Sequence, residues 1–160
     1  MKRRYNLIDV ANYLIKVSSE KNKDRTRLNI LLYLFYATYR QYTKKRPFRA
    51  YPRVGILFPY FKPIERHFNG LSKDKWGNLS YRKYQKLSND DVLNHILLSL
   101  LTWAEGKSNE YLINMINEKK TTYAQFIDIQ NNVDLDKKMK LPFVSAYIEL
   151  SPVHGINLYY

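Results

Sequence analysis

Apolar residues near the N-terminus recur at every third or fourth position, which is the period of an amphipathic helix. Asn6 precedes this stripe and is a favoured N-cap residue, and Asp9 stands where an acid reaches back to the cap in a capping box. The pattern predicts a helix that begins after Asn6 and ends in the polar segment 18–25. Its apolar face consists of Leu7, Val10, Leu14 and Val17.

The next segment, Thr26 to Tyr42, is apolar on nearly every side of a predicted helix. A helix of this kind packs against neighbours on several sides. We therefore expect it to be the centre of the fold. Its main face carries Leu28, Leu31, Leu32, Phe35 and Tyr39, which Ile30, Leu34 and Tyr36 widen.

Prolines and glycines divide the chain after this helix, and a long helix cannot run through residues 47–61. Val54–Phe58 is a candidate short strand, and Pro63 suits the first turn of a short helix over 64–68. Residues 71–86 are polar and contain a Gly77-Asn78 turn, which predicts either a β-hairpin or an irregular loop.

Helical periodicity returns in the C-terminal half. Ser88-Asn89-Asp90-Asp91 is a second capping-box pattern, Ser108 caps a further predicted helix, and Thr121 or Thr122 caps another that carries Tyr123, Phe126 and Ile127. Phe143–Leu150 fits a helix or a strand. The first of these helices points Val92, Ile96, Leu97, Leu100, Leu101 and Trp103 inward.

These elements predict a mainly α protein with a minor β-hairpin or short strands. We expect one domain over residues 1–160, a compact helical bundle around a central buried helix. The longest apolar run, Ile30–Ala37, has eight residues, far fewer than the ~20 of a membrane span. The basic N-terminus is followed by a polar helix, so no signal peptide and no membrane partner are expected.

Cysteine is absent from the chain. This excludes a thiolate nucleophile, a disulfide framework and a cysteine-based zinc site, and it fits a cytoplasmic location. The histidines His67, His95 and His154 do not have the spacing of a zinc motif, and no phosphate-binding glycine loop or nucleophile elbow is present. Asp90-Asp91 is explained by capping. We expect no enzymatic activity, no cofactor and no metal site.

Charge divides the chain into two unequal parts. Residues 1–86 contain 21 Lys and Arg against 5 Asp and Glu, a net charge of +16, whereas residues 87–160 contain 6 against 9, a net charge of −3. A one-sided positive field steers anionic partners such as nucleic acid or an acidic protein surface. The alternative is that the charge only keeps the protein soluble.

The cations of the basic part form two groups interleaved with aromatic residues. Phe48 and Tyr51 accompany the first group, and Trp76, Tyr81 and Tyr84 accompany the second, which also includes Lys86. Cations bind phosphates, and aromatic rings stack on unpaired bases. The alternatives are solvated surfaces, with Phe48 and Tyr51 anchored in the core. The predicted partner-binding residues are Lys44, Lys45, Arg46, Arg49, Tyr51, Arg53, Lys73, Lys75, Arg82 and Lys83.

Three segments resemble the Panacea family, a SocA-like and phage-associated domain family. They are Asp-Val-Ala-Asn-Tyr-Leu-Ile at 9–15, Leu-Asn-Ile-Leu-Leu-Tyr at 28–33 and Pro-Phe-Arg-Ala-Tyr at 47–51, and the resemblance spans residues 5–130. The chain departs from the family in having Ile30 in place of a lysine and Tyr51 in place of a tryptophan. Where family members carry a Gly-Pro-Val loop, this chain has Val54-Gly55-Ile56.

The resemblance implies a compact, mainly helical domain of phages and mobile elements that acts as an antitoxin by binding a protein directly, without a cofactor. The first functional hypothesis is therefore an antitoxin-like protein that neutralises a protein partner, either a toxin or a defence complex. The alternative, based on charge, is an anti-CRISPR-like counter-defence inhibitor or a nucleic-acid-binding protein whose basic half blocks a nucleic-acid site.

Overall fold

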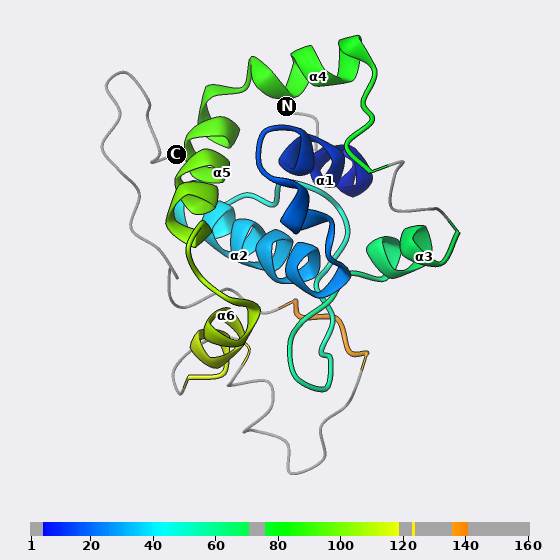
Figure 1. The fold of residues 1–160 in the computed structure, drawn as a ribbon. Coiled ribbons are helices and arrows are strands. Elements are labelled where there is room, and N and C mark those ends of the chain that lie inside the picture. The colour runs from blue at the N-terminus through cyan, green and yellow to red at the C-terminus, as the bar shows by residue number, and fades with distance from the viewer. Residues whose placement is uncertain (1–4, 71–75, 119–122, 124–135, 141–160) are drawn as a thin grey trace.

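The computed structural model describes residues 5–70, 76–118, 123 and 136–140. Within them the fold is built on helices and contains no named strand, which confirms the predicted mainly α class. Figure 1 shows α2 in the middle of the bundle, with α5, α6 and α3 around it and α1 and α4 on one side. The elements are α1 (Leu7–Lys16), the short 3₁₀ helix η1 (Glu20–Lys23), α2 (Arg25–Thr43), α3 (Lys62–Gly70), α4 (Tyr81–Ser88), α5 (Asp91–Ala104) and α6 (Asn109–Ile116).

The central helix α2 is buried along most of its length, as its apolar sequence predicted. Every residue from Arg27 to Tyr39 is buried. Asp24 caps its N-terminus by accepting a hydrogen bond from the Arg27 backbone N at 2.9 Å. The helix ends at Lys44, which adopts the left-handed conformation with φ 62° and donates its backbone N–H to the Arg40 carbonyl.

The helix α1 begins where the sequence predicted, because the Asn6 side chain accepts from the backbone N of Ile8 and Asp9. The proposed capping-box role of Asp9 was wrong. Its carboxylate lies 3.2 Å from the Lys83 ammonium, so the acid links α1 to α4 instead of closing its own cap.

The predicted start of α6 is confirmed, and α5 begins within the predicted segment, but its cap is Asp90 and not Ser88, which ends α4. Asp90 accepts from the Leu93 backbone N at 3.0 Å, and Ser108 accepts from the Tyr111 backbone N at 3.1 Å. The predicted inward residues of α5 are buried, except that Trp103 is only half-buried and lies against the Lys107 ammonium.

The prediction of a hairpin or irregular loop over 71–86 was wrong for residues 81–86, which are helical, whereas residues 76–80 form a turn and irregular chain as predicted. Trp76 is buried against His67 and Phe68, and Gly77 turns with φ 89°. The helix α4 then begins after Ser80, whose hydroxyl accepts from the Lys83 backbone N. Tyr81, Tyr84 and Leu87 recur along it at every third position, which is a helical signal, but the helix has only eight residues and buries only Leu87.

The candidate strand Val54–Phe58 was wrong as well. Residues 53–60 form a loop closed by backbone hydrogen bonds between Arg53 and Tyr60 at 2.8 and 3.1 Å. On its other side Arg53 pairs with Lys138, so segment 136–140 lies against this loop, as Figure 1 shows. The short helix after Pro63 is confirmed as α3.

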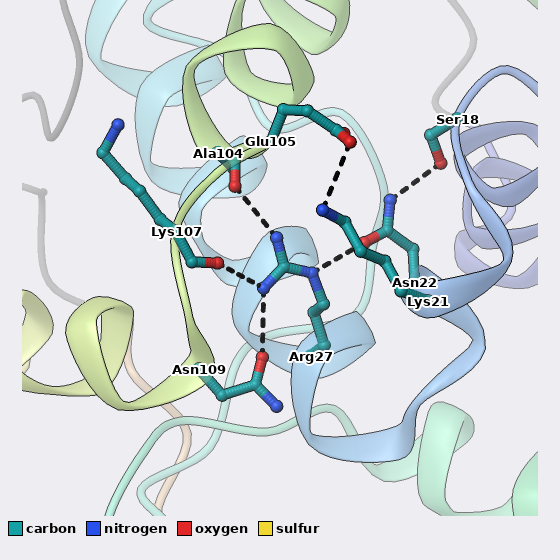
Figure 2. Close-up of polar contacts among 8 residues, drawn as sticks. All are labelled: Ser18, Lys21, Asn22, Arg27, Ala104, Glu105, Lys107 and Asn109. Carbon is teal, nitrogen blue, oxygen red and sulfur yellow. Dashed lines mark hydrogen bonds and ion pairs between the residues drawn. The ribbon is translucent and has the colours of Figure 1, made fainter.

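A buried arginine joins the N-terminal end of α2 to the α5–α6 junction (Figure 2). Arg27 is 5% exposed and donates to the Asn22 side chain, to the carbonyls of Ala104 and Lys107 and to the Asn109 side chain, at 2.8 to 3.2 Å. Burial lowers the pKa of Arg27, and the carboxylates of Glu105 and Asp24 oppose this shift.

Some predictions fall on residues outside the described ranges. They are the helix after Thr121 or Thr122 apart from Tyr123, the element at 143–150, and the site residues Lys73 and Lys75. The described helices share one hydrophobic core, and the single domain over 1–160 stays a prediction. Within the described residues, no helix is long and apolar enough to cross a membrane.

Candidate functional site

The loop after α2 carries the first predicted group of cations, and its path is fixed by one buried ring. Phe48 is fully buried and packs 5.5 Å from both Tyr36 and Phe61, measured between ring centroids. The Tyr5 backbone N donates to the Pro47 carbonyl at 2.9 Å beside it. The alternative of a core anchor is thus confirmed for Phe48, and the loop is held while its cations extend outward.

Tyr51 lies beneath cations from two distant segments. The Arg46 guanidinium lies 4.2 Å and the Lys140 ammonium 5.7 Å from the centroid of its ring. Arg46 also donates to the Arg49 carbonyl at 3.3 Å. Burial raises the pKa of the Tyr36 hydroxyl, and nearby Arg46 and Arg40 oppose this shift. Several cations therefore gather around two tyrosines.

Segment 136–140 adds lysines that the sequence analysis assigned to the acidic half. Met139 is buried and its backbone N donates to the Pro52 carbonyl, while Lys138 and Lys140 on either side of it are exposed. Arg53 donates a side-chain hydrogen bond to the Asp136 carbonyl at 3.0 Å. The run Lys137-Lys138-Met139-Lys140 was the available signal, but no local pattern placed it against the loop.

We call Arg46, Arg49, Arg53, Lys138 and Lys140 the cationic loop surface. The described ion pairs involve other cations: Lys21 with Glu105, Lys23 with Glu20, Arg25 with Glu65 and Lys83 with Asp9. Asp136, the acid within segment 136–140, accepts from the Tyr60 hydroxyl. This surface therefore has no described carboxylate in an ion pair with it.

The predicted residues Lys44 and Lys45 are exposed at the end of α2, just before this surface. The Lys44 ammonium donates to the Gln41 carbonyl at 2.9 Å, so it also compensates the negative end of the helix. The part of both lysines in binding a partner stays a prediction.

Only some of the described cations of the second predicted group, which lies at residues 73–86, are left unpaired for an anionic partner. Lys83 is paired with Asp9, Arg82 is exposed on α4, and Lys86 lies 5.4 Å from the centroid of the Tyr5 ring. Because Tyr5 also contacts Pro47, the end of α4 adjoins the loop. The two groups are therefore neighbours at Tyr5, although the second is partly neutralised.

The candidate site is a group of Arg and Lys side chains, and the described residues around it form no arrangement of acid, base and nucleophile. No cluster of three or more His, Asp or Glu side chains there is placed to hold a metal ion. His95 is buried, and its Nε2 atom has no hydrogen-bond partner among the described residues. It is remote in sequence from the loop after α2.

Comparison of the chain with protein-family models, with curated proteins and with solved structures gives no match. The resemblance to the Panacea family therefore rests on the three sequence segments described above.

Proposed function

We propose that this chain is a non-enzymatic binding protein that meets an acidic surface of a protein partner through its cationic loop surface. One observation carries the proposal: cations from segments more than 80 residues apart, such as Arg53 and Lys138, converge without a described carboxylate to pair with them. Exposed like charges repel one another and favour an anionic partner.

The aromatic residues of the loop after α2 favour a protein partner over unpaired bases, whereas Tyr81 on α4, in the second predicted group, is 75% exposed. Base stacking needs an open ring face. Phe48 is fully buried, and Tyr51 is half-buried beneath Arg46 at 4.2 Å. The loop therefore presents cations and no free stacking platform, which suits carboxylates on a protein.

The resemblance to the Panacea family supports a more specific form of the proposal. The chain would act as an antitoxin encoded by a phage or another mobile element, and it would neutralise a toxin by direct contact. The absence of a described metal cluster is compatible with this role but does not argue for it.

A second candidate is the binding of duplex nucleic acid, as in a counter-defence inhibitor that blocks a nucleic-acid site. The same uncompensated cations favour it, because phosphate contacts require no stacking ring. Its binding should weaken steeply as salt rises, since each neutralised phosphate releases counterions.

The two candidates are separated by measuring affinity for the purified product of the neighbouring gene and for short single- and double-stranded DNA. We expect Arg49→Glu/Lys138→Glu to weaken protein binding by at least about tenfold. The matched control Lys16→Glu/Arg66→Glu makes the same charge change at exposed residues of α1 and α3 that are not among the predicted partner-binding residues. An equal loss in the control would show that total charge governs binding, and salt-sensitive DNA binding without protein binding would favour the second candidate.

A further inference from the structure

Two adjacent aliphatic side chains project from the loop that follows the cationic surface. Ile56 is 80% exposed and Leu57 is 63% exposed. The neighbouring residues Val54 and Pro59 are buried. Single exposed apolar residues are common on protein surfaces, so the pair needs further observations before it is given a role.

The backbone that carries this pair is held in place from three directions. Arg53 and Tyr60 close the loop by two backbone hydrogen bonds. The Asn117 side chain donates to the Leu57 carbonyl at 2.9 Å, and the Tyr123 hydroxyl donates to the Gly55 carbonyl at 2.8 Å. A Cβ atom on Gly55 would lie 2.2 Å from the Phe58 carbonyl oxygen, so the bend requires glycine.

A rigid loop loses little conformational freedom when it binds, and that cost otherwise reduces affinity. The apolar pair is also bordered by positive charge, because Arg53 at the base of the loop pairs with Lys138. The hydroxyl of Tyr60 holds the Asp136 carboxylate at the same place. The tip thus combines a fixed aliphatic pair with a border of net positive charge, in which Arg53, Lys137 and Lys138 outnumber the one carboxylate of Asp136.

We propose that Ile56 and Leu57 are the anchor that enters an apolar recess on the protein partner, and that carboxylates of the partner rim this recess. The inference rests on the proposed function and names the chemistry of its partner. Interfaces commonly have a buried apolar centre within a polar rim. A second copy of this chain is disfavoured because two cationic borders would meet. An anionic lipid surface would also attract a cationic border, so vesicle binding is one outcome of the test.

The test compares the affinities of three variants for the product of the neighbouring gene. Ile56→Gln/Leu57→Gln changes the anchor, and Leu98→Gln/Tyr111→Gln is the matched control, because these side chains are 43% and 52% exposed on α5 and α6. Arg49→Glu/Lys138→Glu tests the charge. We expect the anchor variant to bind about tenfold more weakly or worse and the control to stay within about threefold of wild type. Circular dichroism should show all three folded, since the changed side chains are exposed.

Each outcome decides between the two proposals. Normal binding by the anchor variant, with binding lost in the charge variant, overturns the anchor and leaves the proposed function standing. Normal binding by the charge variant, or no binding by wild type, overturns the proposed function and the anchor with it.

A photoreactive phenylalanine analogue at position 57 provides a second readout. It should crosslink to an apolar peptide of the partner that is bordered by Asp or Glu. Wild-type binding to vesicles of phosphatidylserine and phosphatidylcholine that is lost in the anchor variant would assign the tip to a lipid surface and overturn the inference.

Discussion

The two ends of α2 hold arginines in opposite ways. At the N-terminal end, Arg27 is buried and its N–H groups donate to Asn22, Ala104, Lys107 and Asn109. Beyond the C-terminal end, Arg49 is exposed and its side chain has no ion pair with a described carboxylate. One arginine is therefore part of the fold, whereas the other is left for solvent or a partner.

The difference shows why net charge alone does not locate a binding surface. Arg27 belongs to the strongly basic half of the sequence, yet its charge is enclosed, and Lys138 belongs to the acidic half, yet it joins the cationic loop surface. A cation is available to a partner when it is exposed and when no nearby group has taken its charge or its hydrogen bonds. The following predictions test that distinction, from the largest expected effect to the smallest.

Removal of the buried arginine should have the largest effect. Arg27→Met leaves the Asn22 side chain and the Ala104 and Lys107 carbonyls without their donor. We expect the free energy of unfolding to fall by about 3–5 kcal/mol, as measured by urea titration with circular dichroism. Arg66→Met is the matched control on the exposed face of α3 and should stay within about 0.5 kcal/mol of wild type. A cost below about 1 kcal/mol for Arg27→Met would contradict the structural role of this network.

Alkaline pH should weaken the interior of the fold. Burial raises the pKa of Tyr123 from its ordinary value of 10.0 to about 12. Between these values the unfolded chain releases a proton that the folded chain retains, so stability falls as pH rises. For Tyr123 the fall reaches at most about 1.4 kcal/mol per pH unit.

Urea titrations across this pH range measure the effect, and Tyr123→Phe should reduce the slope. An unchanged slope in that variant would show that other groups control alkaline unfolding. Burial also raises the pKa values of Tyr36 and Tyr13, so part of the pH dependence should persist.

The Arg46–Tyr51 stack should contribute a small stability term. Replacement of the ring by Tyr51→Leu removes the contact at 4.2 Å, and such contacts at partly exposed sites contribute about 0.5–1 kcal/mol. A double-mutant cycle with Arg46→Gln isolates the coupling from other effects of each change. A coupling energy near zero would mean that the contact of Arg46 with the Tyr51 ring adds nothing to stability.

Sequence patterns predicted those helices whose caps and apolar stripes coincide. Asn6 and Ser108 cap the helices expected from them, Asp90 caps α5 two residues after the Ser88 that begins the capping-box pattern, and the apolar α2 is buried at the centre. The helix α4 was missed although Tyr81, Tyr84 and Leu87 recur at every third position, because it has only eight residues and the Gly77-Asn78 turn before it suggested a hairpin.

The site was harder to predict because its parts are distant in the chain. The basic loop was identified from composition, but the pairing of Arg53 with Lys138 is non-local and has no sequence signature. Val54–Phe58 has the apolar composition of a buried strand, yet Ile56 and Leu57 are exposed. The enclosure of Arg27 was equally hidden, since its acceptors are backbone carbonyls from another helix junction.

The contrast is between Arg27, which is enclosed by the fold, and the cationic loop surface, whose charges are left for a partner. Its most direct test is the free energy of unfolding of Arg49→Gln/Lys138→Gln at low salt, since both side chains are exposed. If these cations serve a partner rather than the fold, removing them relieves mutual repulsion. The variant should then be as stable as wild type or up to about 1 kcal/mol more stable. A loss of more than about 1 kcal/mol would mean that the cationic loop surface stabilises the fold, and it would contradict the account.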